Sequence, residues 1–139
     1  MGAQLMQGDV VALVGELGSG KTWMTKGIAL GLDVDPNTIV TSPSFALVNE
    51  YAGRLTFFHI DIYRMESLSE LVSAGIEEYL GAEGVVAMEW ADRWPEILPE
   101  HSVRISIDIL DENNRKITFS GQHPRALSIM DAVRKEVKK

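Results

Sequence analysis

Two continuous apolar runs in the chain predict strands that are buried on both faces. Residues 10–15 read VVALVG and residues 85–90 read VVAMEW, and a glycine lies shortly before each run. Strands of parallel sheets are covered on both sides, so they show such runs instead of a strict alternation. We therefore expect both segments inside a mostly parallel sheet.

Alternating apolar and polar positions predict two antiparallel hairpins beside this core. The first is expected to turn at Ala52-Gly53, and the second at residues 111–114, which read DENN. Their four arms are residues 45–51, 54–63, 103–110 and 115–121.

Helical spacing and helix-capping residues predict the remaining elements. Ser67 is followed three residues later by Glu70, a capping-box pattern, while Gly31 and Gly75 are expected to end two of the helices. The expected helices are residues 21–30, 67–74, 77–80 and 124–139. Four apolar residues share part of one face of the first helix: Trp23, Met24, Ile28 and Leu30.

The segment between the first strand and the first helix matches the pattern of a phosphate-binding loop. Its glycines allow successive backbone N–H groups to turn inward around an anion, and the next helix points its positive end at the same place. In this pattern Lys21 reaches the β- and γ-phosphates and the Thr22 hydroxyl binds Mg²⁺. The other residues of the loop that we expect to bind nucleotide are Gly15, Gly18, Ser19 and Gly20.

These elements together predict a P-loop NTPase-like α/β fold with three layers. The sheet is expected to be mostly parallel, with antiparallel hairpins added to it. The 139 residues show no linker or internal repeat, so we expect a single domain that spans residues 1–139.

A P-loop that hydrolyses its nucleotide needs acidic residues near the metal and the attacking water. The run at 85–90 supplies Glu89, and the arm at 54–63 supplies Asp61. Strand alternation puts His59 on the same face as Asp61, and we interpret this histidine as a structural one. Thr41, in a Thr-Ser-Pro-Ser segment, lies where a switch segment would sense the γ-phosphate. No Asn-Lys-x-Asp stretch is present to select guanine.

Composition limits the location and the partners of the protein. The formal net charge is −7, whereas a stand-alone nucleic-acid binder normally presents a basic surface. There is no cysteine, no apolar run near the roughly 20 residues that a membrane helix needs, and no secretory-type start. We therefore expect a cytoplasmic protein without membrane contact. The basic tail at 134–139 is interpreted as a solvated helix end.

The motifs taken together resemble the TsaE (YjeE) family of bacterial ATPases. The P-loop alone would not select this family, but the order of four blocks does. These blocks are GELGSGKT, TSPSFALVNEY, FHIDIYR and VVAMEW, the last followed by ILPE, and the resemblance extends from about residue 8 to residue 121.

The resemblance implies a role in making the threonylcarbamoyl modification of tRNA adenosine. Family members bind ATP, hydrolyse it weakly alone, and act with the TsaB–TsaD pair, in which TsaD transfers the group to tRNA. Contact with tRNA is thus expected only through the partners, which agrees with the acidic composition.

Residue roles are also implied by the resemblance. Thr22 and Glu89 correspond to the residues that hold Mg²⁺. The catalytic positions correspond to Asp61, Lys21 and the switch residue Thr41. Trp23 is counted among the residues that contact the nucleotide, and Arg115 is the nearest match to a basic residue beside the adenine, where its planar head can stack on a purine.

One departure from the family pattern concerns the start of the chain. Family members usually begin with an additional short strand and helix, whereas only residues 3–6 precede the first apolar strand here. We therefore expect the fold to lack that strand and helix. Two other functions stay open: a small-molecule kinase, and a nucleotide-sensing adaptor without meaningful turnover.

Overall fold

The computed structural model describes residues 1–16, 20–40, 48–63, 65–80 and 84–137, and the statements below concern these residues. Six strands form one sheet in the order β2-β3-β4-β1-β5-β6. The strands are β1 (Val10–Gly15), β2 (Val48–Tyr51), β3 (Phe57–Asp61), β4 (Val85–Glu89), β5 (Val103–Ile109) and β6 (Arg115–Ser120). The inner strands β3, β4, β1 and β5 run parallel, and β2 and β6 complete antiparallel hairpins at the two edges. This confirms the predicted fold class.

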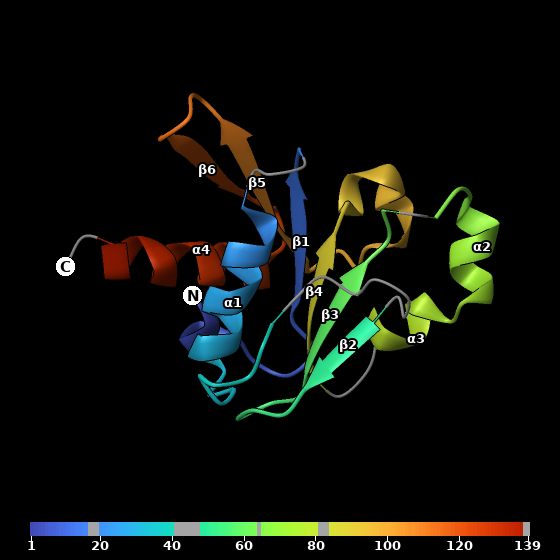
Figure 1. Cartoon of the computed structure of the whole chain (residues 1–139), viewed down its shortest axis with the longest axis horizontal. Coiled ribbons are helices and arrows are strands. Elements are labelled where there is room, and N and C mark those ends of the chain that lie inside the picture. The colour runs from blue at the N-terminus through green and yellow to red at the C-terminus, as the bar shows by residue number, and fades with distance from the viewer. Residues whose placement is uncertain (17–19, 41–47, 64, 81–83, 138–139) are drawn as a thin grey trace.

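Helices cover both faces of the sheet and complete three layers (Figure 1). The helices are α1 (Lys21–Gly31), α2 (Leu68–Ser73), α3 (Ile76–Leu80) and α4 (Pro124–Val137), with short 3₁₀ turns η1 (Gly2–Gln4), η2 (Ala91–Arg93) and η3 (Pro95–Ile97). In Figure 1, α1 and α4 lie on one side of the sheet and α2 and α3 on the other. The Ser67 hydroxyl accepts a hydrogen bond from the backbone N–H of Glu70, so the predicted cap of α2 is confirmed.

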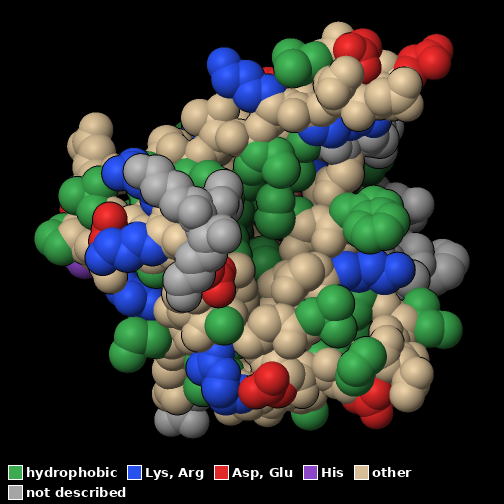
Figure 2. All heavy atoms as spheres, turned by 90° about the vertical axis from the view of Figure 1, so that its left-hand side faces the viewer, with side chains coloured by type: hydrophobic (Ala, Val, Ile, Leu, Met, Phe, Trp, Pro, Cys, Tyr) green, Lys and Arg blue, Asp and Glu red, His purple; other side chains and the backbone are tan. Residues whose placement is uncertain are grey.

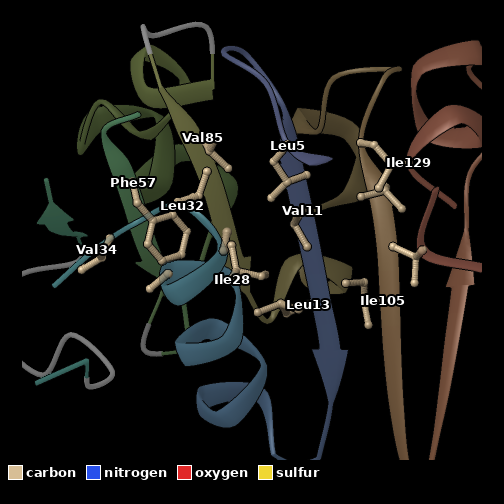
Figure 3. Packing of buried hydrophobic residues seen from close by; sticks show 14 of the residues in the cluster. Leu5, Val11, Leu13, Ile28, Leu32, Val34, Phe57, Val85, Ile105 and Ile129 are labelled. Atoms are coloured by element: carbon tan, nitrogen blue, oxygen red, sulfur yellow. The ribbon is translucent and has the colours of Figure 1, made fainter. Parts of the chain in front are cut away.

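Strand alternation divides the buried residues into two clusters. Val11 and Leu13 of β1 pack with Ile28 of α1 and Ile129 of α4, as Figure 3 shows. The other faces of the inner strands pack beneath α2 and α3, in a cluster whose members include Val10, Ala12, Ile60, Leu71 and Ile76. This two-sided burial explains why the segment at 10–15 is apolar throughout.

The buried face of α1 differs from the prediction. Of the four apolar residues expected to share a face, Ile28 is buried, but Trp23 is 80% exposed and Leu30 is also exposed. The helix instead buries Thr25, whose hydroxyl donates a hydrogen bond to the Lys21 carbonyl at 2.9 Å and so needs no water. A satisfied hydroxyl can occupy a core position, which the apolar pattern alone does not reveal.

Two turns differ from those predicted at Gly31 and at Ala52-Gly53. Gly31 belongs to α1, and a Cβ at Gly31 would lie 2.6 Å from the Gly2 Cα, so this glycine allows η1 to pack closely on the helix. The connection between β2 and β3 spans residues 52–56 and not only Ala52-Gly53. In this connection the Arg54 N–H donates to the Leu32 carbonyl, which fixes the longer turn against the end of α1.

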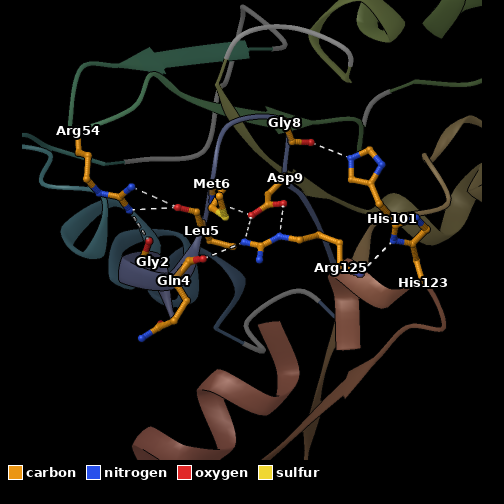
Figure 4. Close-up of polar contacts among 10 residues, drawn as sticks. All are labelled: Gly2, Gln4, Leu5, Met6, Gly8, Asp9, Arg54, His101, His123 and Arg125. Carbon is orange, nitrogen blue, oxygen red and sulfur yellow. Dashed lines mark hydrogen bonds and ion pairs between the residues drawn. The ribbon is translucent and has the colours of Figure 1, made fainter. Parts of the chain in front are cut away.

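An ion pair between a buried carboxylate and a half-buried guanidinium fastens α4 to the segment just before β1. The Asp9 carboxylate accepts hydrogen bonds from Arg125 Nε at 2.9 Å and Arg125 Nη2 at 2.6 Å, and also from the Met6 N–H at 2.7 Å (Figure 4). Arg125 Nη2 donates as well to the Gln4 carbonyl at 2.9 Å. The pair therefore ties the segment before β1 to both the sheet and α4.

Candidate active site

The parallel strands bring three predicted site residues to one edge of the sheet. β1 ends at Gly15, β3 at Asp61 and β4 at Glu89, and Glu89 lies in register with both Leu13 of β1 and Asp61 of β3. Ligands of open α/β sheets bind outside the carboxyl ends of the strands. The two carboxylates consequently lie at the same edge of the sheet as the end of β1.

Lys21 is held against the end of β1 by the start of α1. Gly20 precedes the helix with a φ of 109°, a conformation that favours glycine, and Lys21 is the first helical residue. The buried ammonium donates to the Gly15 carbonyl at 2.5 Å and to the Glu16 carbonyl at 3.1 Å. Burial lowers the pKa of Lys21, while Glu89 and then other acidic neighbours oppose this lowering.

The indole ring of Trp90 lies against the ammonium of Lys21. Its φ of 64° is unusual for a residue with a side chain, and its N–H donates to the Leu13 carbonyl at 3.1 Å. The Lys21 ammonium lies 4.1 Å from the centroid of the indole ring, within the range of a cation–π interaction. The ring also packs on Tyr63, at 4.9 Å between centroids. Sequence reasoning quoted the Glu-Trp block but assigned no role to this tryptophan.

Glu89 is almost completely buried, and a histidine contacts its carboxylate. Its exposed fraction is 3%, and Glu89 Oε2 lies 2.5 Å from His59 Nε2. His59 is itself fully buried in β3. The histidine is internal, as expected of a structural residue, but its contact is with a predicted metal ligand. Finding this contact from sequence would have required the pairing of β3 with β4.

Asp61 combines partial burial with nearby charges of both signs. Burial raises the pKa of Asp61, the hydrogen bond from the Tyr63 N–H to Oδ1 lowers it, and the Glu89 carboxylate raises it further. His59 and Lys21 favour the ionised form. Such a carboxylate, beside a second one and a buried ammonium, is suited to accept a hydrogen bond from a water molecule.

The donor set fits magnesium that binds together with a phosphate ligand. Within the described part of the chain, no group of three or more His, Cys, Asp or Glu residues is arranged to hold a metal ion. Mg²⁺ commonly uses one or two protein carboxylates and completes its shell with substrate phosphates and water. Glu89 and the hydroxyl of Thr22, next to Lys21, are oxygen donors of this kind.

A second group of predicted residues lines a pocket next to the start of α1. This pocket of about 670 Å³ lies between α1 and the β5–β6 hairpin, and it contacts Gly20, Trp23, Gly27 and Arg115. The Arg115 guanidinium donates to the Asp111 and Asn114 carbonyls, which holds it at the hairpin turn. Figure 2 shows charged side chains at the tip of this hairpin above a hollow with hydrophobic walls. The pocket is open to the surface.

Three predicted site residues, Gly18, Ser19 and Thr41, lie outside the described residues, so their roles remain predictions. The structure therefore brings Lys21, Asp61 and Glu89 together at one edge. It places Trp23 and Arg115 at an adjoining pocket that shares Gly20.

The order of the strands, and an α1 that begins at Lys21 directly after Gly20, define an α/β protein of the P-loop NTPase-like class. Residues 1–117 match the family model described as "Threonylcarbamoyl adenosine biosynthesis protein TsaE". The chain belongs to the TsaE family.

Individual relatives agree with this assignment. The chain is 43% identical over 120 residues to the tRNA threonylcarbamoyladenosine biosynthesis protein TsaE of Treponema pallidum, covering 86% of this chain and 87% of that one. It is 44% identical over 114 residues to the protein of the same name from Bacillus subtilis, covering 81% and 70%. The crystal structure of Bacillus subtilis YdiB matches with a TM-score of 0.80 and 34% identity, over 97% of this chain and 82% of that one.

No helix of the described residues has the length and apolar character to cross a membrane.

Proposed function

We propose that this chain is the ATP-binding, weakly ATP-hydrolysing subunit of the system that installs the threonylcarbamoyl group on tRNA adenosine. The observation that carries the proposal is the meeting of Lys21, Asp61 and Glu89 at the carboxyl edge of the parallel strands, in a chain of the TsaE family. The nucleotide state would drive the cycle of TsaB–TsaD-type partners in the cytoplasm. The partners, and not this acidic subunit, would hold the tRNA.

Each residue has a distinct part in this proposal. Lys21 and the N-terminus of α1 bind the phosphates, assisted by the loop residues Gly18 and Ser19. Thr22 and Glu89 hold Mg²⁺, which supplies charge neutralisation for the transferring phosphoryl group.

Asp61 positions the attacking water. Its Oδ1 accepts the Tyr63 N–H, which fixes the carboxylate at the strand end. Thr41 responds to the γ-phosphate as a switch residue, and Trp23 and Arg115 flank the adenine in the neighbouring pocket.

The burial of Lys21 supports a binding role for the ammonium. A buried cation that already bonds carbonyl oxygens loses little solvation when a phosphate oxygen replaces them. Charge-assisted hydrogen bonds contribute about 1.5–3 kcal/mol, so Lys21→Ala is expected to weaken ATP binding by about 10- to 100-fold.

The test is ATP binding and hydrolysis by the purified chain, alone and with TsaB, TsaD and tRNA, beside a Lys21→Ala control. We expect Mg²⁺-dependent binding, slow turnover alone and faster turnover with the partners. Turnover that the partners leave unchanged but small metabolites increase would replace the proposal with the kinase function. A third outcome would favour the adaptor. In that case neither the wild type nor Asp61→Asn would turn over ATP, and ATP would still change the binding of both to the partners.

A further inference from the structure

The contact between His59 and Glu89 joins two strands at the floor of the active site. His59 lies in register with Ala87 on β4, and Asp61, two residues further along β3, lies in register with Glu89. Residues opposite each other on paired strands share a face, so the His59 and Glu89 side chains are diagonal neighbours on one face. Ala87, directly opposite His59, is small and leaves the imidazole room to reach the carboxylate.

The surroundings of His59 do not account for a histidine by packing alone. Its side chain is fully buried, and neighbouring positions on the same face, Phe57 and Ala87, belong to the hydrophobic cluster under α1. Its Nδ1 has no hydrogen-bond partner within the described residues, although buried polar atoms are normally paired. A residue with a purely structural role at this position would be better replaced by an apolar one. The contact that His59 does make is with Glu89.

The terminal torsion of a glutamate is soft, so a carboxylate in an active site needs a partner to fix its plane. The Nε2–H of His59 can donate to Glu89 Oε2 from a ring that its own burial holds still. The ammonium of Lys21 is a competing partner, because it lies 4.1 Å from the ring of Trp90, the residue that follows Glu89. In agreement, Glu89 is the charged group that most opposes the lowering of the pKa of Lys21. A carboxylate that turned onto the lysine would neutralise the phosphate-binding charge and the metal-binding charge together.

We propose that His59 is a positioning residue, which holds the Glu89 carboxylate in the orientation that receives nucleotide-bound Mg²⁺ and keeps it from pairing with Lys21. This inference rests on the proposed function, in which Glu89 is a magnesium ligand. Hydrogen-bond partners of metal ligands typically contribute 10- to 100-fold in metal affinity. The effect should therefore lie in the magnesium requirement and not in nucleotide binding as such.

The experiment measures binding of a fluorescent, non-hydrolysable ATP analogue over a range of Mg²⁺ concentrations and, separately, in EDTA. His59→Leu removes the donor, while His59→Gln keeps an N–H near the position of Nε2. We expect His59→Leu to raise the Mg²⁺ concentration for half-maximal enhancement by about 10- to 100-fold. Its affinity in EDTA should stay close to that of the wild type, and His59→Gln should recover most of the magnesium response.

Several outcomes would overturn the inference. A wild-type magnesium midpoint in His59→Leu would show that Glu89 needs no such partner. An equal loss of affinity with magnesium and in EDTA would show that His59 only supports the fold. If His59→Leu does not fold, as judged by circular dichroism, the same measurements are made on His59→Asn. The asparagine amide is too short to reach Glu89 Oε2, so this variant also removes the donor. Magnesium-independent binding by the wild type would instead refute the magnesium site of the proposed function.

Discussion

Replacing Asp9 by asparagine removes the charge that joins β1 to α4 and leaves a side chain of nearly the same shape. Asp9 accepts two hydrogen bonds from Arg125 and one from the Met6 N–H. The ion pair raises the pKa of Arg125, with the hydrogen bond to Asp9 as the largest cause. Because these contacts fasten the segment before β1, the substitution is expected to loosen that segment and lower global stability.

The size of the effect follows from burial. Removing one partner of a buried ion pair costs about 3–5 kcal/mol. The Arg125 side chain is 25% exposed and recovers part of its hydration, and the asparagine oxygen still accepts one hydrogen bond, so we expect about 2–3 kcal/mol. For a domain of this size, 1 kcal/mol corresponds to roughly 3–5 °C, which gives a fall in Tm of about 6–15 °C.

The matched control is Asp131→Asn on α4, the helix that carries Arg125. Asp131 pairs with Lys135 at 3.1 Å, but the two side chains are 56% and 75% exposed, so its loss should cost no more than about 0.5 kcal/mol. Thermal unfolding at low and high salt measures both variants. The Asp9 effect should persist in high salt and largely vanish in an Arg125→Met background. A Tm for Asp9→Asn no lower than that of Asp131→Asn would refute the reasoning.

Three further substitutions test other parts of the structure. Burial raises the pKa of Asp61 above its unfolded value. The stability linked to this group is therefore present in acid and lost as the pH rises through the folded pKa. Asp61→Asn should raise Tm at pH 7, and this gain should fade below about pH 4. An unchanged Tm at neutral pH would count against this sign. Gly31→Ala should lower the free energy of unfolding by about 1–2 kcal/mol, because the new Cβ would meet the backbone of Gly2. Gly27→Ala should raise it by about 0.5–1 kcal/mol, because a Cβ at Gly27 meets no other atom and alanine favours the helix. Urea titrations measure both variants. Ser67→Ala should cost about 1 kcal/mol through loss of the α2 cap, and a loss below about 0.3 kcal/mol would show that the cap is not needed.

The fold was largely predictable because its elements carry local signals. Period-two alternation, continuous apolar runs and capping residues depend on neighbours in sequence, and they located the strands and helices, including the cap at Ser67. The strand-end positions of Asp61 and Glu89 already made both residues candidates, and the resemblance to a family added the particular role expected of each.

The features that sequence reasoning missed depend on contacts between distant segments. The exposure of Trp23 and the burial of Thr25 follow from how α1 lies on the sheet. The role of Gly31 depends on the approach of η1, and the partner of Glu89 depends on the register of β3 against β4. None of these relations has a periodic signature along the chain, so a single sequence does not disclose them.

The central position of β1 has a consequence for the synthesis of the protein. β1 leaves the ribosome before β4 and β5, yet these are its two neighbours in the sheet, so that Val10 pairs with Val86 and Val11 with Val103. Contacts between residues so far apart form late, and an apolar strand without partners is prone to aggregate in the meantime. Until β4 and β5 have both been translated, at least one edge of the VVALVG strand has no partner, so the nascent chain must keep that edge exposed or bound to a chaperone. The strand that leads into the phosphate loop is thus made before its neighbours and gains its final structure only after them.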